Sequence, residues 1–290
     1  MVVVTTHLRE AVRGQVYQQF LVCHDDWPGY REARFQVHAI DAEGAVVIAR
    51  AVRRGGLLSF FSSLPRCLVA MEACSSAHHW WGRALTELGF SVKLIPPAYV
   101  KPYVRRGKND AADAAAICEA ARRPTMRFAP VRGVDNQAQL MRHRARELLA
   151  GNRTRMLNAL RGNLAEIGVV AAQGAHHAYA LKRLVADGFD ENGEVVVPDC
   201  VRQALAPLVH QIDAIDAEIE AIDELIKTLV KADETARRLM TIPGVGPITA
   251  SAIVATVRET SAFSNGREFA AYLGLTPRQS SSGGKERQLR

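Results

Sequence analysis

The pattern of hydrophobic and polar positions in the first third of the chain alternates between strand and helix periodicity. The expected elements are strands at 35–40, 45–50, 67–71 and 91–95 and helices at 57–64 and 76–88. Asp41 and Gly44 suit a hairpin turn between the first two strands, and Gly89 suits the end of the second helix. Hairpin strands followed by strand, helix and strand predict a mixed α/β sheet.

The middle of the chain has helical periodicity. No proline interrupts 137–167, and apolar residues in 202–230 recur at steps of three and four with acidic residues between them. The apolar positions are Ile212, Ile215, Ile219, Ile222, Ile226 and Leu229. This seam predicts a coiled-coil arm of two antiparallel helices or a contact between chains. The segment 174–198 contains Gly, Asp and Asn and is expected to be a connecting loop.

The last part of the chain contains a glycine turn between two apolar segments. Gly244 and Gly246 lie in Ile242-Pro243-Gly244-Val245-Gly246-Pro247, which predicts a helix-hairpin-helix. The glycines allow close backbone approach, and N–H groups at the start of the second helix can bind a phosphate. An ordinary tight turn between helices is the alternative. Residues 278–287 are polar and are expected to be flexible.

The net charge of +7 is concentrated in one stretch of the chain. Residues 101–163 contain 14 Lys and Arg against five acidic residues. Such a stretch predicts a polyanion partner, because each neutralised phosphate releases counterions; a solvated helix face is the alternative.

Other features of the composition indicate a soluble, cytoplasmic protein. No apolar run reaches the ~20 residues of a membrane helix, and no signal peptide is recognisable. The five cysteines are scattered without metal-site spacing, so we expect reduced, buried thiols.

Three acidic residues are candidates for a metal site. Glu72 follows an apolar strand, so it is expected at the carboxyl edge of the sheet. Asp110 and Asp113 share one face of an expected helix over 110–121. Converging carboxylates repel unless a cation lies between them, and Mg²⁺ prefers such oxygen ligands. Each acid alone is more often a helix cap or a surface charge. The basic residues just before the helix are Lys101, Arg105, Arg106 and Lys108.

Six blocks in the same order resemble the DEDD transposases of the IS110 family, most closely the IS1111 group. The blocks are Phe35-Gln36-Val37-His38, Met71-Glu72-Ala73-Cys74-Ser75-Ser76-Ala77-His78, Lys101-Pro102-Tyr103-Val104, Lys108-Asn109-Asp110-Ala111-Ala112-Asp113-Ala114, Ile242-Pro243-Gly244-Val245-Gly246-Pro247 and Gly274-Leu275-Thr276-Pro277-Arg278-Gln279. The resemblance extends over about 35–287.

The resemblance implies an α/β plus all-α architecture. It divides the chain into a divergent segment 1–34, a RuvC-like, RNase H-type domain at 35–135, a helical coiled-coil region at 136–235 and a C-terminal transposase domain at 236–290. It further implies a Mg²⁺ site of four carboxylates, a serine nucleophile, DNA and a structured guide RNA as partners, and no membrane partner. A homo-oligomer is also expected.

Carried over by position, Glu72, Asp110 and Asp113 match the second, third and fourth acids of the family. Ser282 best matches the nucleophile, and Ser280 and Ser281 are less favoured. The residues expected to bind nucleic acid are Lys101, Arg105, Arg106, Lys108, Arg153, Arg155, Arg161, Gly244, Gly246 and Lys285.

Two departures from the family pattern bear on activity. The position of the first acid holds Gly29, although Asp25 or Asp26, which follow the apolar run 20–23, can replace it; of these we assign Asp26 as a metal ligand. The chain also ends just after 284–287, where the family continues, so we expect a truncated C-terminus. A catalytically inactive nucleic-acid binder and an RNase H-like resolvase or nuclease are therefore alternatives.

Overall fold

The computed structural model describes residues 17–23, 34–41, 43–74, 77–104, 110–189, 192–257, 263–275, 278–282 and 285–289. For 17–23, 34, 78–80, 110, 175, 278–282 and 285–289 it describes the backbone alone. The chain divides into two compact units, Met1–Gln137 and Ala138–Arg290, and each is described by itself.

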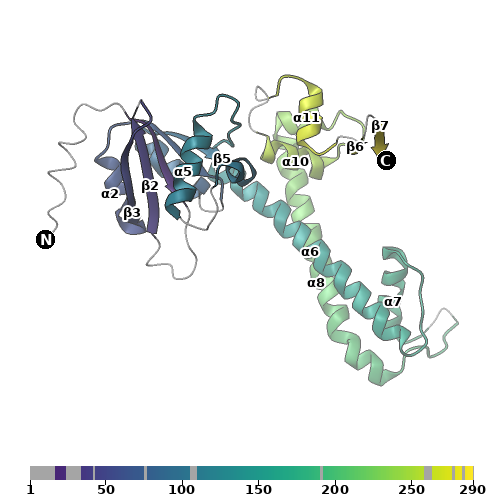
Figure 1. Ribbon diagram of the computed structural model, residues 1–290. Coiled ribbons are helices and arrows are strands. Elements are labelled where there is room, and N and C mark those ends of the chain that lie inside the picture. Colours follow the sequence, from purple (N-terminus) through teal and green to yellow (C-terminus); the bar gives the residue numbers. More distant parts are fainter. Residues whose placement is uncertain are drawn as a thin grey trace. The chain divides into compact units, whose positions relative to one another are not determined.

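The first unit is built on a five-stranded mixed sheet (Figure 1). The strands are β1 (Tyr17–Cys23), β2 (Arg34–Asp41), β3 (Val46–Arg53), β4 (Leu68–Glu72) and β5 (Ser91–Ile95). Their order across the sheet is β3-β2-β1-β4-β5. β1 is antiparallel to β2 and parallel to β4, which is in turn parallel to β5. The strand Tyr17–Cys23, which lies before the resemblance begins, is therefore the central strand.

Helices cover both faces of this sheet. The elements outside the sheet are η1 (Arg54–Gly56), α2 (Leu57–Ser62), η2 (Ala77–Arg83), α3 (Ala84–Glu87), α4 (Pro97–Val100), η3 (Lys101–Tyr103) and α5 (Asp110–Ala121). Successive residues of β4 point to opposite faces: Val69 and Met71 pack with Leu57 and Phe61 of α2, and Ala70 packs in a separate core with α5. The predicted mixed α/β architecture is confirmed for this unit.

The local signals for turns are also confirmed. β2 and β3 form an antiparallel hairpin, in which the Asp41 carboxylate accepts a hydrogen bond of 2.7 Å from the Ala45 N–H. Gly44 and Gly89 have φ of +93° and +87°, which glycine adopts without steric cost. The helix expected over 76–88 is divided, since η2 is a π-helical turn and only α3 is α-helical.

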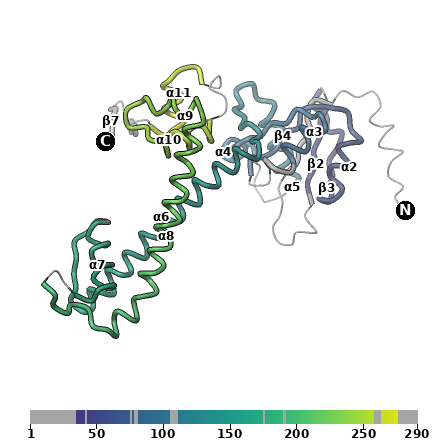
Figure 2. The backbone as a smooth tube through the Cα atoms, turned by 180° about the vertical axis from the view of Figure 1, so that it is seen from behind, coloured from purple at the N-terminus to yellow at the C-terminus, as the bar shows by residue number. Residues whose placement is uncertain are grey.

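The second unit is dominated by two long helices, α6 (Val134–Ala165, which begins in the first unit) and α8 (Asp199–Ala232). Figures 1 and 2 show them side by side and antiparallel. The predicted apolar seam is buried along α8, including Ile212, Ile219 and Ile226. Leu160 and Leu164 of α6 pack in the same core as Ile212.

One expectation for this unit is wrong. The segment 174–198, expected to be a loop, contains helix α7 (Ala175–Asp187). Leu181 and Val185 of α7 are buried against α6 and α8, so tertiary packing stabilises a helix whose polar flanks suggested a loop.

The C-terminal part adds three short helices and a hairpin. They are α9 (Glu234–Leu239), α10 (Pro247–Thr256), α11 (Gly266–Tyr272), β6 (Arg278–Ser282) and β7 (Lys285–Leu289). Ala236 of α9 and Ala250 of α10 are buried with Ile226 and Val230 of α8. The expectation of a flexible tail at 278–287 is wrong for its described residues, because β6 and β7 pair as antiparallel strands.

The cysteine prediction is only partly right. Among the described side chains, Cys67, Cys74, Cys118 and Cys200 form no disulfide, but Cys200 is exposed and only Cys118 is buried. Burial raises the pKa of the Cys67 thiol to about 12 and of the Cys118 thiol to about 11. Within the described residues, no helix has the length and apolar character needed to cross a membrane.

Candidate catalytic site and nucleic-acid interface

The carboxyl ends of two parallel central strands meet at one edge of the sheet. Glu72 is the last residue of β4, and its side chain is half-buried. In the parallel ladder Val22 of β1 pairs with Met71, so β1 and β4 end level, at Cys23 and Glu72. Asp25 and Asp26 follow two and three residues after Cys23 and lie outside the described residues. Glu72 thus lies at the sheet edge where its position after an apolar strand predicted it.

Helix α5 carries the other two candidate acids. It packs against β1, β2 and β4. Ala114 and Ile117 are fully buried beneath it, and its many alanines allow close approach of helix and sheet. Asp110 is its first residue, with an undescribed side chain, and Asp113 is half-buried one turn later. The helix that carries Asp110 and Asp113 therefore packs on the two strands that end at Cys23 and Glu72.

Among the described side chains, no group of three or more His, Cys, Asp and Glu residues forms a metal-binding cluster. That set excludes Asp25, Asp26 and the side chain of Asp110. Glu72 and Asp113 are the described members of the expected site, and their carboxylates have the oxygen chemistry that Mg²⁺ prefers.

The residues flanking the catalytic set are described in part. Lys101 is exposed at the start of η3, and Arg105, Arg106 and Lys108 lie outside the described residues. Ser282 is the last residue of β6 and pairs across the hairpin with Lys285, although both are described by backbone alone.

The turn between α9 and α10 depends on one of its two glycines. Gly244 has φ of +86°, in the left-handed region, and the Val245 N–H after it donates to the Ile242 carbonyl at 3.0 Å. Gly246 caps α10 with an ordinary φ of −88°. A Cβ at either glycine would meet no atom within 4 Å, so the turn is open.

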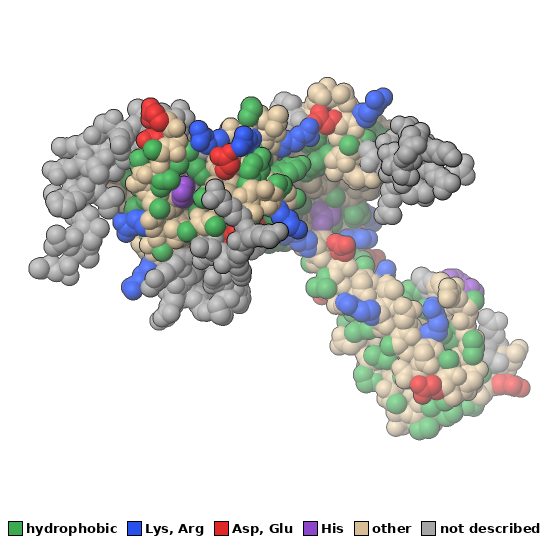
Figure 3. Space-filling view, viewed as in Figure 1, with side chains coloured by type: hydrophobic (Ala, Val, Ile, Leu, Met, Phe, Trp, Pro, Cys, Tyr) green, Lys and Arg blue, Asp and Glu red, His purple; other side chains and the backbone are tan. Residues whose placement is uncertain are grey.

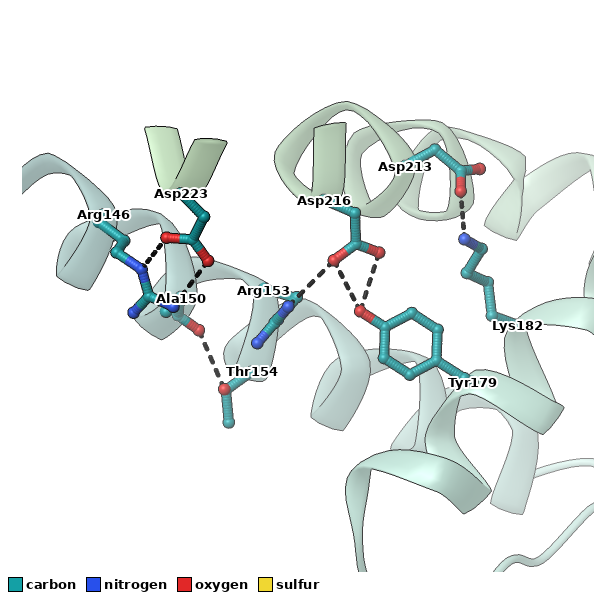
Figure 4. A network of polar contacts seen from close by, with 9 residues as sticks. All are labelled: Arg146, Ala150, Arg153, Thr154, Tyr179, Lys182, Asp213, Asp216 and Asp223. Atoms are coloured by element: carbon teal, nitrogen blue, oxygen red, sulfur yellow. Dashed lines mark hydrogen bonds and ion pairs between the residues drawn. The ribbon is translucent and has the colours of Figure 1, made fainter. Parts of the chain in front are cut away.

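Arginines on α6 form ion pairs with aspartates on α8 (Figure 4). Two guanidinium nitrogens of Arg146 contact the two carboxylate oxygens of Asp223, and the Nη2–Oδ2 distance is 3.0 Å. The hydrogen bond from Arg146 lowers the pKa of the Asp223 carboxyl. Nη1 of Arg153 lies 3.2 Å from Oδ1 of Asp216. Both arginines therefore hold the two long helices together.

Helix α7 is attached to the same pair of helices by polar contacts. The Tyr179 hydroxyl donates to the Asp216 carboxylate, 2.7 and 2.8 Å from its two oxygens, and Lys182 pairs with Asp213 (Figure 4). Burial, followed by the hydrogen bond to Asp216, raises the pKa of the Tyr179 hydroxyl. One carboxylate, that of Asp216, thus joins three helices.

Comparisons with known proteins assign the chain to a family. A family described as "Transposase IS116/IS110/IS902 family" matches residues 236–290, and the DEDD transposase of IS110 type, described as "Transposase", matches 32–169. A probable family 20 transposase of Pseudomonas aeruginosa is 43% identical over 254 residues, covering 87% of this chain and 74% of that protein. The chain belongs to the IS110 family of transposases.

Other relatives agree with this membership. A putative transposase of Sinorhizobium fredii is 42% identical, and the match covers 87% of this chain but only 64% of that protein. The transposase for insertion sequence element IS1328 of Yersinia enterocolitica is 37% identical and is covered to 73%. The predicted membership is confirmed, and the chain is a DNA transposase of the insertion-sequence type.

The IS110 family matches include Glu72, Asp110, Asp113 and Ser282 but begin after β1.

The ion pairs between α6 and α8 were missed by sequence reasoning. A signal for them exists: Arg146 and Arg153 are seven residues apart, as are Asp216 and Asp223, and the pairing is in reverse order, as antiparallel helices require.

Proposed function

We propose that this IS110 family transposase cleaves and rejoins DNA strands through carboxylates of the first unit and a serine of the second, guided by a structured RNA. The observation that carries the proposal is the parallel register of β1 and β4, which end level at Cys23 and Glu72. A RuvC-like, RNase H-type unit needs acids at this edge; Glu72 ends one of the two strands, and Asp25 and Asp26 follow the last residue of the other in the sequence.

The first acid is proposed to be Asp26. The central place of β1 in the sheet supports this assignment, because the chain leaves that strand only a few residues before Asp25 and Asp26. With Glu72, Asp110 and Asp113, Asp26 would complete a set of four carboxylates that fits Mg²⁺. Bound there, Mg²⁺ would neutralise the scissile phosphate and stabilise the leaving oxygen.

Ser282 is proposed as the nucleophile. Its hydroxyl oxygen forms a bond to phosphorus and gives up its proton, while the bond to the leaving strand's oxygen breaks and that oxygen takes a proton. The phosphoserine ester conserves the energy of the phosphodiester, so the strand can be rejoined without another energy source. The pairing of Ser282 with Lys285 at the hairpin end supports a role for Lys285 in holding the phosphate.

Binding of DNA and guide RNA is proposed to use the basic stretch and the glycine turn. Lys101 is exposed, and Arg105, Arg106 and Lys108 follow it in the sequence. Arg155 and Arg161 contact only neutral oxygens among their described partners, which leaves their charge for phosphate. Arg153 stays a predicted contact, although Asp216 already neutralises it in part. The open turn at Gly244 and Gly246 supports the helix-hairpin-helix assignment.

The antiparallel α6–α8 pair supports the coiled-coil assignment. We propose that residues 136–235 form that coiled-coil domain. We further propose that the protein forms a homo-oligomer and is located in the cytoplasm.

Substitution of the acids tests the catalytic assignment. The full chain is incubated with its element DNA, the RNA encoded beside the element and Mg²⁺, and strand cleavage is followed on denaturing gels. Glu72→Gln and Asp26→Asn are expected to abolish cleavage without changing nucleic-acid binding. Glu87→Gln, an exposed acid at the end of α3, is the matched control and should cleave normally. Cleavage retained by Glu72→Gln would overturn the site, and cleavage lost in Asp25→Asn but kept in Asp26→Asn would move the first acid.

A further inference from the structure

The arginines of α6 lie on two opposite faces of the helix. At about 100° per residue, Arg146 and Arg153 are on the side that contacts Asp223 and Asp216 of α8. Arg144 and Arg155 are separated by eleven residues, or about three turns, and lie about 180° away from the first pair. Both are exposed, and neither forms an ion pair with a carboxylate in the part of the chain that the structure describes.

A shallow hollow of about 450 Å³ lies between these two outward arginines. It is lined by Arg144, Glu147, Leu148, Gly151 and Arg155. The exposed fraction of Leu148 is 61%, so no other described element of the second unit covers the hollow. Figure 3 shows that Lys and Arg side chains are exposed on both units, and the hollow adds two such charges to an open helix surface.

Glycine in this hollow has no explanation in the packing of the chain itself. Gly151 is in the interior of α6, where glycine destabilises a helix relative to alanine, and a Cβ there would meet nothing within 4 Å. Gly162, the other interior glycine of the helix, lies on the same face, is exposed and is equally free of neighbours. Glycine exposes the helix backbone to a closely approaching partner from outside.

We propose that the face of α6 formed by Arg144, Leu148, Gly151 and Arg155 binds the phosphate backbone of duplex DNA. This inference rests on the proposed nucleic-acid binding and assigns it to a surface that includes Arg144, which sequence reasoning did not select. The two arginines are about 16 Å apart along the axis. Duplex DNA carries one charge per ~1.7 Å of its axis, so both guanidinium groups can meet phosphates together.

The salt dependence of DNA binding tests this proposal. The full chain and its variants are titrated against a labelled random-sequence duplex at several salt concentrations. Loss of two phosphate contacts is expected to reduce the slope of log K against log[salt] by about 1.8 in Arg144→Gln/Arg155→Gln. The control, Arg146→Gln/Lys182→Gln, removes the same charge at residues paired with α8 aspartates, and its slope should stay at the wild-type value.

Gly151→Ala provides an independent variant that does not threaten folding. It is expected to raise the melting temperature while weakening DNA binding several-fold, because its methyl group occupies the floor of the hollow.

An unchanged slope in the double variant, with wild-type DNA binding intact, would overturn this proposal and leave the proposed function standing. Absence of DNA binding by the wild-type chain would instead count against the proposed function. Two further results would show that this face does not bind duplex DNA. In the first, the double variant keeps its binding to duplex DNA and loses only its binding to a duplex RNA of the same length. In the second, light scattering shows that the double variant has a changed oligomeric state.

Discussion

The guanidinium of Arg146 and the carboxylate of Asp223 form a two-point ion pair between α6 and α8, and Arg153 and Asp216 form a second, single-point pair seven residues away. Because the helices are antiparallel, the two pairs fix their register. A shift by one residue would separate both pairs and move the seam of Ile212 and Ile219 out of the core. The polar pairs and the apolar seam thus specify the same alignment.

Breaking the first pair should destabilise the second unit. Asp223→Asn removes a charge-assisted, bidentate contact whose side chains are 31% and 22% exposed. We expect a loss of about 1–2 kcal/mol in the free energy of unfolding, measured by urea denaturation. The control is Glu224→Gln, which removes the exposed pair with Lys227 and should leave the free energy of unfolding nearly unchanged, because water screens a pair on the surface. Equal effects of the two variants would show that the pair does not set the register.

A histidine on α6 is expected to make the stability of the second unit depend on pH. Nε2 of His143 lies 3.0 Å from Oγ of Ser251, a buried polar side chain of α10, and burial followed by Arg146 and Arg142 lowers the pKa of His143. As the pH falls, His143 is therefore protonated at a higher pH in the unfolded chain than in the folded chain. The free energy of unfolding should fall as pH drops below the usual histidine value of about 6.5, with the loss levelling off below the folded-state pKa.

Urea denaturation between pH 5 and pH 8 measures this dependence. His143→Gln keeps a polar partner for Ser251 but cannot titrate, so its stability should vary less over the range. A variant that follows the wild-type pH dependence in full would assign the effect to other groups.

The two glycines of the turn before α10 should respond differently to alanine. A Cβ at either glycine would contact no other atom, so the two substitutions should differ only through the backbone conformation at each position. Gly244→Ala places a side chain at φ of +86° and should cost about 1–2 kcal/mol, whereas Gly246→Ala at −88° should be nearly neutral. Thermal melting of both variants measures the difference. A similar loss at Gly246 would mean that the turn is constrained by something other than backbone conformation.

Much of the fold could be predicted because local chemistry determines it. The strand periodicity of 35–50, the Asp41 and Gly44 turn and the three-four spacing along 202–230 each agree with the structure. The α7 helix could not be predicted, because its stability comes from burial of Leu181 and Val185 against two distant helices. The π-helical turn at 77–83 has no local signature that we can identify.

The candidate site was predicted unevenly for a similar reason. Glu72 and α5 follow from strand and helix patterns, and the position of Glu72 level with the end of β1 follows from the parallel pairing of the two strands. Sequence reasoning assigned 1–34 to a divergent segment, and the place of Tyr17–Cys23 at the centre of the sheet emerges only from pairing with β2 and β4. The register between α6 and α8 determines which arginines of α6 contact acidic residues and which face away from α8. This register depends on residues far apart in the sequence.

Detection of a covalent protein–DNA intermediate is the most direct test of the proposed serine chemistry. The full chain is incubated with element DNA, its RNA and Mg²⁺, and adducts are resolved on denaturing gels and located by peptide mass spectrometry. The account predicts an adduct on Ser282 that Ser282→Ala abolishes, whereas Ser280→Ala retains it. An adduct that persists in Ser282→Ala, or cleavage that ignores Ser282 but requires Asp110, would contradict the serine mechanism. Salt-sensitive binding with no Mg²⁺-dependent cleavage by the wild-type chain would contradict catalysis altogether.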